Sequence, residues 1–180
     1  MTAPRRPADL LPPRFATLAV ALAGRSGSGK TALMEALVRE LHARGLRVAC
    51  IKRAAHGFEI DQEGKETWRL RGAGAAVMLV SSQSEVARIE RVENEWTLEE
   101  LLALAVDCDV VLVKGFRDAA LRTIECLSPG ELPRTSPGRL LAVISEAPVD
   151  VDARWLRPSD TAAVADLIIA QHRGSADTIR

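Results

Sequence analysis

The feature that most constrains this chain is a change of hydrophobic pattern within its first third. Residues 15–24, FATLAVALAG, form an apolar run bounded by turn-forming residues, which predicts a β-strand buried on both faces. A glycine- and serine-rich segment follows, and then leucines recur at every fourth position, at Leu33, Leu37 and Leu41. This spacing predicts an amphipathic helix that ends at Gly45. A second apolar run at 46–54 predicts another buried strand, which such a crossover places parallel to the first.

The segment between the first strand and the helix reads GRSGSGKT and matches the spacing G-x-x-x-x-G-K-[ST]. Its glycines let successive main-chain N–H groups point inward at a phosphate, and the helix N-terminus adds partial positive charge. The ammonium of Lys30 is expected to reach the β- and γ-phosphates, and the hydroxyl of Thr31 to bind Mg²⁺. We therefore predict a phosphate-binding loop (P-loop) for a nucleoside di- or triphosphate, which consists of Gly24, Ser26, Gly27, Ser28, Gly29, Lys30, Thr31 and Ala32.

The identity of the base does not follow from the residues. The guanine-reading motif N-K-x-D of regulatory GTPases is excluded, because the chain contains a single asparagine, Asn94, in the unsuitable context ENEW.

The remainder of the chain predicts one α/β domain over residues 15–173, with a mainly parallel sheet flanked by helices and a β-hairpin extension. A disordered lead is expected at 1–14 and a flexible tail at 174–180. The hairpin is expected at 75–92, after a short helix at 67–75. Further strands are expected at 109–116, 122–127 and 140–147, and further helices at 97–106 and 160–173, the last of them capped by Ser159.

Composition excludes several functional classes. The formal net charge is zero, so no overall field attracts nucleic acid or a membrane surface, and any anion site must be local. Three tryptophans, three phenylalanines and no tyrosine argue against a base-stacking platform. Three cysteines without C-x-x-C spacing are interpreted as buried small hydrophobic residues in a reducing compartment. With no signal-peptide or bilayer-spanning pattern, we expect a cytoplasmic protein without nucleic-acid or membrane partners.

A second group of charged residues lies at 51–75, directly after the second strand. In open parallel sheets ligands bind beyond the carboxyl ends of the strands, so this segment is expected near the glycine loop if the two strands lie close together. Asp61 is then a candidate ligand of Mg²⁺; the competing interpretation is a solvated loop. The four lysines, against twenty arginines, all fall in segments expected on the phosphate side: Lys30, Lys52, Lys65 and Lys114.

Over residues 16–127 the chain resembles the molybdopterin-guanine dinucleotide biosynthesis adapter proteins, the MobB family. The likeness rests on the glycine loop with its leucine-bearing helix, on segment 51–75, and on DVVLVKGFRDAALRTIECL at 109–127. The middle segment is the most specific. It is similar to the family pattern I-K-H…H-x-F/M-x-x-D-x-x-G-K-D-S…A-G-A at Ile51, Lys52, His56, Phe58, Asp61, Gly64, Lys65, Ala73, Gly74 and Ala75.

The resemblance implies a homodimeric, GTP-binding protein with a P-loop fold, at most a weak GTPase. Such a protein assists a separate MobA-type guanylyltransferase that joins GMP to molybdopterin, and molybdopterin itself is a further candidate ligand. Five residues of the middle segment are then candidates for contacting the partner or the substrate: Lys52, Arg53, His56, Phe58 and Lys65.

One departure from the family pattern affects the predicted site. The corresponding strand of the family typically ends L-V-E-G-F/Y, with a glutamate that orients Mg²⁺ and its water, whereas this chain has Lys114 in LVKGF. The exchange reverses the charge beside the metal position. Two interpretations follow: Mg²⁺ binding is weakened, or Lys114 contacts a phosphate itself and partly replaces the ion. Arg53 for histidine and Glu66-Thr67 for Asp-Ser are milder departures.

Two other functions compete with the adapter. A small P-loop metabolite kinase needs an arginine-rich lid over the phosphates, and the short segment GFRDAALR offers Arg117 and Arg122 for it. A metallochaperone-type GTPase needs clustered cysteine or histidine ligands, which the sequence lacks.

Overall fold

The computed structural model describes residues 18–176, with side chains up to residue 171. They form two compact units: one comprises 18–53 together with 98–176, and the other is Ala54–Thr97. The predicted lead at 1–14 lies outside the described residues, as do residues 177–180 of the predicted tail. The single-domain boundaries expected from the sequence stay a prediction.

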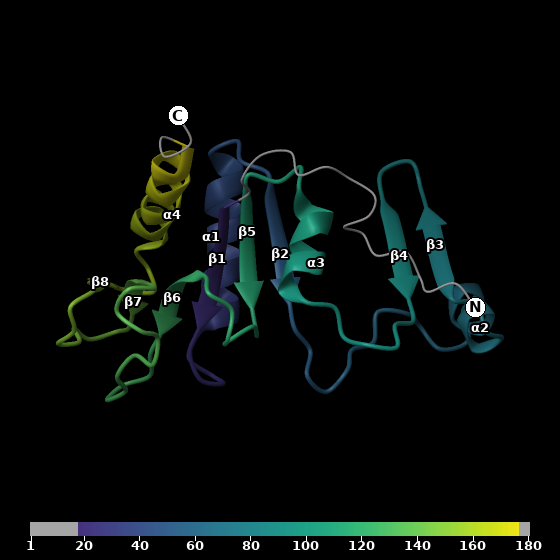
Figure 1. Cartoon of the computed structure of the whole chain (residues 1–180), viewed down its shortest axis with the longest axis horizontal. Coiled ribbons are helices and arrows are strands. Elements are labelled where there is room, and N and C mark those ends of the chain that lie inside the picture. Colours follow the sequence, from purple (N-terminus) through teal and green to yellow (C-terminus); the bar gives the residue numbers. More distant parts are fainter. Residues whose placement is uncertain (1–17, 177–180) are drawn as a thin grey trace. The chain divides into compact units, whose positions relative to one another are not determined.

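The first unit is built on a six-stranded sheet in the order β2-β5-β1-β6-β7-β8 (Figure 1). Every neighbouring pair in it is parallel. The parallel α/β architecture predicted from the strand–loop–helix–strand pattern is confirmed. The strands are β1 (Leu18–Ala23), β2 (Val48–Lys52), β5 (Val110–Lys114), β6 (Arg122–Cys126), β7 (Leu140–Ile144) and β8 (Arg154–Leu156). Sequence patterning did not identify the three-residue strand β8.

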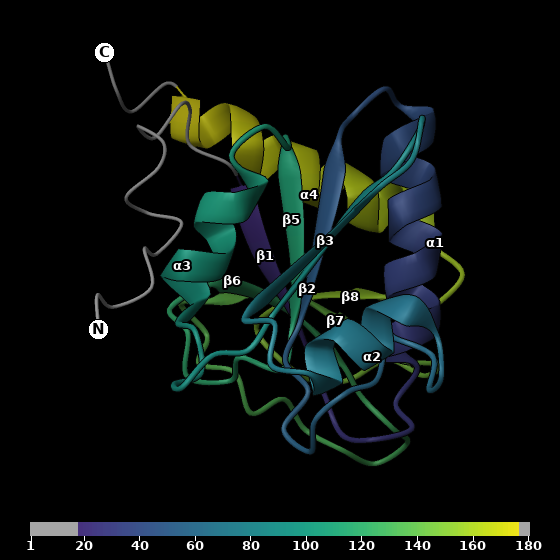
Figure 2. The ribbon, with the colours of Figure 1, turned by 90° about the vertical axis from the view of Figure 1, so that its right-hand side faces the viewer.

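Helices cover both faces of this sheet (Figure 2). Helices α1 (Lys30–Ala43) and α4 (Thr161–Ala176) pack on one face, against alternate side chains of β1, β5 and β6. The predicted leucine row of α1 supplies its buried stripe: Leu33, Leu37 and Leu41 are at most 4% exposed. On the other face, α3 (Leu98–Leu102) and a 3₁₀ turn (Ala103–Ala105) pack against Val111 and Val113. The core therefore holds the start of α1 firmly against the end of β1.

The fold corrects three sequence-based expectations. Strand β2 lies at the sheet edge, so it is not buried on both faces, and Cys50 on it is exposed. The helix expected at 97–106 is a five-residue helix followed by a 3₁₀ turn. Helix α4 begins one residue later than expected: the carbonyl of Asp160, not Ser159, accepts the first helical hydrogen bond, from the N–H of Val164. An apolar run identifies a strand without revealing its position in the sheet, and helix ends depend on tertiary packing.

The second unit contains α2 (Glu66–Gly72) and an antiparallel hairpin of β3 (Val77–Ser81) and β4 (Val86–Glu90). Both the short helix and the hairpin are confirmed predictions. The hairpin turn closes when the N–H of Ser82 donates to the carbonyl of Glu85. No residue between 54 and 97 is fully buried in the described structure. Several large apolar side chains of the hairpin are exposed: Val77, Leu79, Val80 and Val86.

Candidate functional site

The glycine loop joins the carboxyl end of β1 to the start of α1, as its sequence predicts. Gly29 is the N-cap residue of α1 with φ 82°, a left-handed conformation that favours glycine. No side chain caps this helix, and its first turn contains no acidic residue. The first N–H groups of α1 therefore lack the usual side-chain acceptor and are available to an anion.

Gly24 is the point at which the loop packs most closely on the sheet. Its φ of 129° is unfavourable for any residue with a side chain. A Cβ there would overlap the carbonyl oxygen of Cys126 at the end of β6 and lie 2.6 Å from Oγ of Ser28. The hydroxyl of Ser28 donates to the carbonyl of Arg25 at 2.9 Å, which closes the turn. Only glycine at position 24 lets the loop approach β6 in this way.

The side chain of Lys30 folds back over the loop. Its ammonium donates to the carbonyl oxygen of Arg25 and, at 3.3 Å, to Oγ of Ser28. Burial lowers the pKa of Lys30 below its ordinary value of 10.5, and the neighbouring cations Lys114 and Arg117 act in the same direction. Three like charges close together repel one another. A bound polyanion would relieve that repulsion.

Lys114, the last residue of β5, reaches into the same site. Its Nζ donates to Oγ1 of Thr31 at 2.8 Å, across 83 positions of sequence. The strand register places Lys114 level with Leu22, two residues before the glycine loop. The end of the neighbouring strand β2 lies next to Lys114: the N–H of Arg53 donates to the carbonyl of Lys114 at 2.9 Å. The residue that departs from the family pattern is thus in contact with the predicted metal-binding hydroxyl.

A pocket of about 260 Å³ opens at the carboxyl ends of β1, β5 and β6. Its walls come from the glycine loop, from 115–117 and from 127–139, the segment that joins β6 to β7. Its lining is strongly cationic although the whole chain is neutral, which creates a local anion-attracting field. Seven cationic side chains line it, together with two carboxylates: Arg25, Lys30, Arg53, Lys114, Arg117, Arg134 and Arg139, with Glu125 and Glu131.

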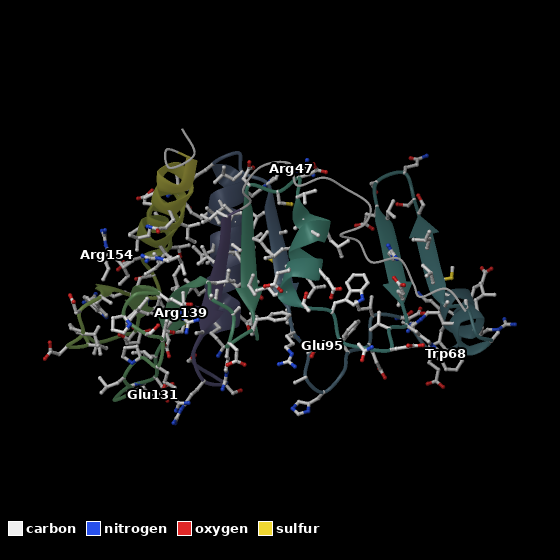
Figure 3. The ribbon with its side chains drawn as sticks, in the orientation of Figure 1. Arg47, Trp68, Glu95, Glu131, Arg139 and Arg154 are labelled. Atoms are coloured by element: carbon white, nitrogen blue, oxygen red, sulfur yellow. The ribbon has the colours of Figure 1, made fainter. Side chains whose placement is uncertain are left out.

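Both carboxylates are engaged by the main chain of segment 127–139, on which Figure 3 labels Glu131 and Arg139. Glu125 is 3% exposed and accepts hydrogen bonds from the N–H groups of Arg134 and Thr135 at 2.9–3.1 Å. Glu131 accepts from the N–H of Ser128, which is the main reason that its pKa lies below 4.5. It also forms an ion pair with Arg25 at 2.8 Å. These contacts shape the pocket wall and tie it to the glycine loop.

Sequence reasoning missed the residues that connect this wall to the loops around the site. The Arg25–Glu131 ion pair links the glycine loop to segment 127–139. Arg139 donates from its guanidinium to the carbonyl of Ala119 at 2.7 Å. No periodicity or motif spacing in the sequence relates these positions to the glycine loop.

The other predicted site residues divide between the two units. Ser26, Gly27 and Ala32 belong to the glycine loop and the first turn of α1, and Lys52 and Arg53 lie at the end of β2. Arg53 lines the pocket. Residues His56, Phe58, Asp61 and Lys65 belong to the second unit, so their predicted roles stay predictions.

Asp61 has contacts of its own within the second unit. Its carboxylate accepts a hydrogen bond from the hydroxyl of Thr67 at 2.6 Å and another from the guanidinium of Arg71 at 3.4 Å. The Thr67 hydroxyl is the main reason that the pKa of Asp61 lies below 3.8, and Arg71 adds to it. Asp61 thus links the loop before α2 to this helix through hydrogen bonds to two of its side chains.

This contact predicts a pH-dependent effect on α2. A carboxylate whose pKa is lowered on folding stabilises the structure above its unfolded pKa and ceases to do so as the pH falls through the folded value. We expect Asp61→Asn to speed amide hydrogen exchange in α2 at neutral pH, and the difference from the parent to shrink as the pH falls through the lowered pKa of Asp61. The exposed Glu63→Gln is the control. Equal α2 exchange in parent and Asp61→Asn at neutral pH would contradict this assignment.

The part of the chain that the structure describes contains neither a candidate metal-binding cluster nor a helix that could span a membrane. Residues 18–171 contain no cluster of three or more histidine, cysteine or acidic side chains that could hold a metal ion. No described helix has the length and apolar character needed to cross a bilayer. All three cysteines are unpaired; burial raises the pKa of Cys126 to about 11, so its thiol stays neutral.

Known proteins are similar to this chain over most of its length. The family model described as "Molybdopterin guanine dinucleotide synthesis protein B" (MobB) matches residues 19–146. A molybdopterin-guanine dinucleotide biosynthesis adapter protein of Escherichia coli (strain K12) is 33% identical over 158 residues, 83% of this chain and 90% of that protein. A protein of the same name from Haemophilus influenzae is 33% identical over 153 residues, 82% of this chain and 85% of that protein.

Solved structures show the same fold. The crystal structure of Bacillus subtilis MobB superimposes with a TM-score of 0.71 at 26% identity, covering 86% of this chain and 97% of that one. A crystal structure of molybdopterin-guanine biosynthesis protein B gives a TM-score of 0.68 at 28% identity, covering 87% of this chain and 99% of that one. With a family model that spans the glycine loop, β5 and β6, the chain belongs to the MobB family.

Proposed function

We propose that this protein is a GTP-binding adapter that assists a MobA-type guanylyltransferase in joining GMP to molybdopterin during molybdenum cofactor biosynthesis. One observation carries the proposal: an uncapped helix N-terminus preceded by a glycine loop borders a strongly cationic pocket. The relatives named as adapter proteins match this chain over more than four fifths of its length. The choice of GTP rests on the family and not on any base-reading residue.

The role that the residues support is holding the nucleotide. The main-chain N–H groups of Gly27 to Thr31 surround a phosphate, and the ammonium of Lys30 moves from the carbonyl of Arg25 to the β- and γ-phosphates. The cations Lys114 and Arg117 add positive charge beside it. Whether Mg²⁺ accompanies the nucleotide depends on Lys114.

Contacts with other proteins are assigned to different parts of the chain. The exposed apolar side chains of the β3–β4 hairpin support a homodimer contact through the second unit. Lys52, Arg53, His56, Phe58 and Lys65 are proposed to contact the guanylyltransferase or molybdopterin; Phe58, 72% exposed, is the apolar member of this set. A cytoplasmic location is proposed because the three cysteines are unpaired.

Calorimetry with GTP and ATP, followed by a coupled assay, tests the proposal. We expect the purified protein to bind GTP more tightly than ATP and to hydrolyse it slowly or not at all. We also expect it to raise the yield of molybdopterin guanine dinucleotide when added to a guanylyltransferase that is supplied with molybdopterin and GTP. Rapid phosphoryl transfer to a small-molecule acceptor would instead identify the protein as a metabolite kinase.

A further inference from the structure

The contact between Lys114 and Thr31 occupies the place at which P-loop proteins hold their metal. In such proteins Mg²⁺ is bound by the serine or threonine of the loop and by an acidic residue at the end of a nearby strand. Here that strand, β5, ends in Lys114, and its ammonium donates to Oγ1 of Thr31 at 2.8 Å. A cation therefore already contacts the one hydroxyl that would bind the metal.

The residues around this contact do not fit Mg²⁺. The ion prefers oxygen ligands in near-octahedral geometry, usually with one or two carboxylates. The two carboxylates that line the pocket, Glu125 and Glu131, accept hydrogen bonds from main-chain N–H groups of segment 127–139. An ammonium beside a divalent cation would also repel it. Within the first unit, the residues that line the pocket bring positive charge and no carboxylate outside these main-chain hydrogen bonds.

We propose that Lys114 takes the place of the divalent metal, so that this chain binds the polyphosphate of its nucleotide without Mg²⁺. The inference rests on the proposed nucleotide-binding function and specifies the ionic form of the ligand. The ammonium is a compact point charge with three N–H donors on a flexible stem. Beside Thr31, this ammonium has further donors for phosphate oxygens, while Lys30 and the loop N–H groups would hold other oxygens of the polyphosphate.

The backbone around Lys114 is fixed by the fold, which keeps its ammonium at this site. It ends a central strand whose preceding residues are at most 1% exposed, so its backbone is fixed while its side chain extends into the pocket. Gly115 follows with φ 99°, and a Cβ there would lie 2.9 Å from Cβ of Arg53. The chain must therefore turn immediately after Lys114, which holds the ammonium beside the glycine loop.

The test compares the affinity for GTP in excess EDTA and in excess Mg²⁺, by calorimetry on the full chain. We expect the parent affinity to differ by less than about threefold between the two conditions. Lys114→Met should bind at least about tenfold more weakly in EDTA, because a charge-assisted contact to the phosphates is lost. Lys114→Glu should bind poorly in EDTA and recover at least about tenfold when Mg²⁺ is added, because a carboxylate then stands beside Thr31.

Controls make each outcome decisive. Arg39→Met removes an exposed cation from α1 and should leave both affinities unchanged. Thermal unfolding of every variant shows whether the fold is retained. A parent that needs Mg²⁺ for tight binding, or a Lys114→Met protein that binds as the parent does in EDTA, overturns this inference and leaves the adapter proposal intact. Absence of GTP binding by the parent under both conditions overturns both.

Discussion

Replacing Lys30 by alanine is expected to lower the affinity for GTP by about 100-fold, because the β- and γ-phosphates lose a charge-assisted donor. The fold should be unaffected. Among the described residues, the Lys30 ammonium donates hydrogen bonds to two groups of its own loop, the carbonyl of Arg25 and Oγ of Ser28. Its removal also relieves repulsion with Lys114 and Arg117. Calorimetric titration together with thermal unfolding measures both effects.

Arg39→Ala is the matched control for this experiment. Arg39 is an exposed cation on the same helix and does not line the pocket. Its replacement should leave nucleotide affinity and thermal stability unchanged. Wild-type affinity in Lys30→Ala would show that the phosphates bind elsewhere, and the assignment of the glycine loop would then be wrong.

Replacing Gly24 by alanine is expected to have the largest effect on stability. The new Cβ would overlap the carbonyl of Cys126 and would force a side chain into a φ of 129°. The carbonyl of Cys126 is backbone at the end of a buried strand, so it cannot move aside cheaply. We expect a loss of about 3 kcal/mol in the free energy of unfolding, or roughly 6–12 °C in melting temperature for a chain of this size. Nucleotide affinity should fall with it, because the loop must withdraw from β6.

Gly138→Ala serves as the control for Gly24→Ala. Gly138 also belongs to the first unit, but a Cβ there would meet no atom within 4 Å and its φ is not left-handed. Its melting temperature should stay close to that of the parent. A Gly24→Ala protein that melts with the parent would show that the loop does not pack on β6 as described.

Local sequence patterns were sufficient for much of the fold. The leucine spacing of α1, the apolar run of β1 and the glycine segment between them are features of neighbouring residues, and the structure confirms all three elements. The hairpin was predictable for the same reason, because an apolar run and an alternating, partly apolar segment flank a short turn. The edge position of β2 and the shortness of α3 were not, because both depend on what packs against these elements.

Asp61 and Lys114 show the same division within the candidate site. Sequence analysis identified both as candidates near the phosphates. The structure shows Asp61 bonded to Thr67 and Arg71 within the second unit, and Lys114 bonded to Thr31 beside the glycine loop. The position of a charged residue in the sequence does not show which side chain it will contact in the fold.

The sequence by itself determined that this protein has a glycine loop between a buried strand and an amphipathic helix, because that motif lies in one short stretch of chain and its physical signals are local. Only the tertiary structure decided what surrounds the loop. The insertion of β5 between β1 and β2 brings Lys114 to Thr31, and the packing of segment 127–139 brings Glu131 to Arg25. Pairing between strands distant in sequence leaves no local periodicity, because it is decided by the packing of the whole sheet.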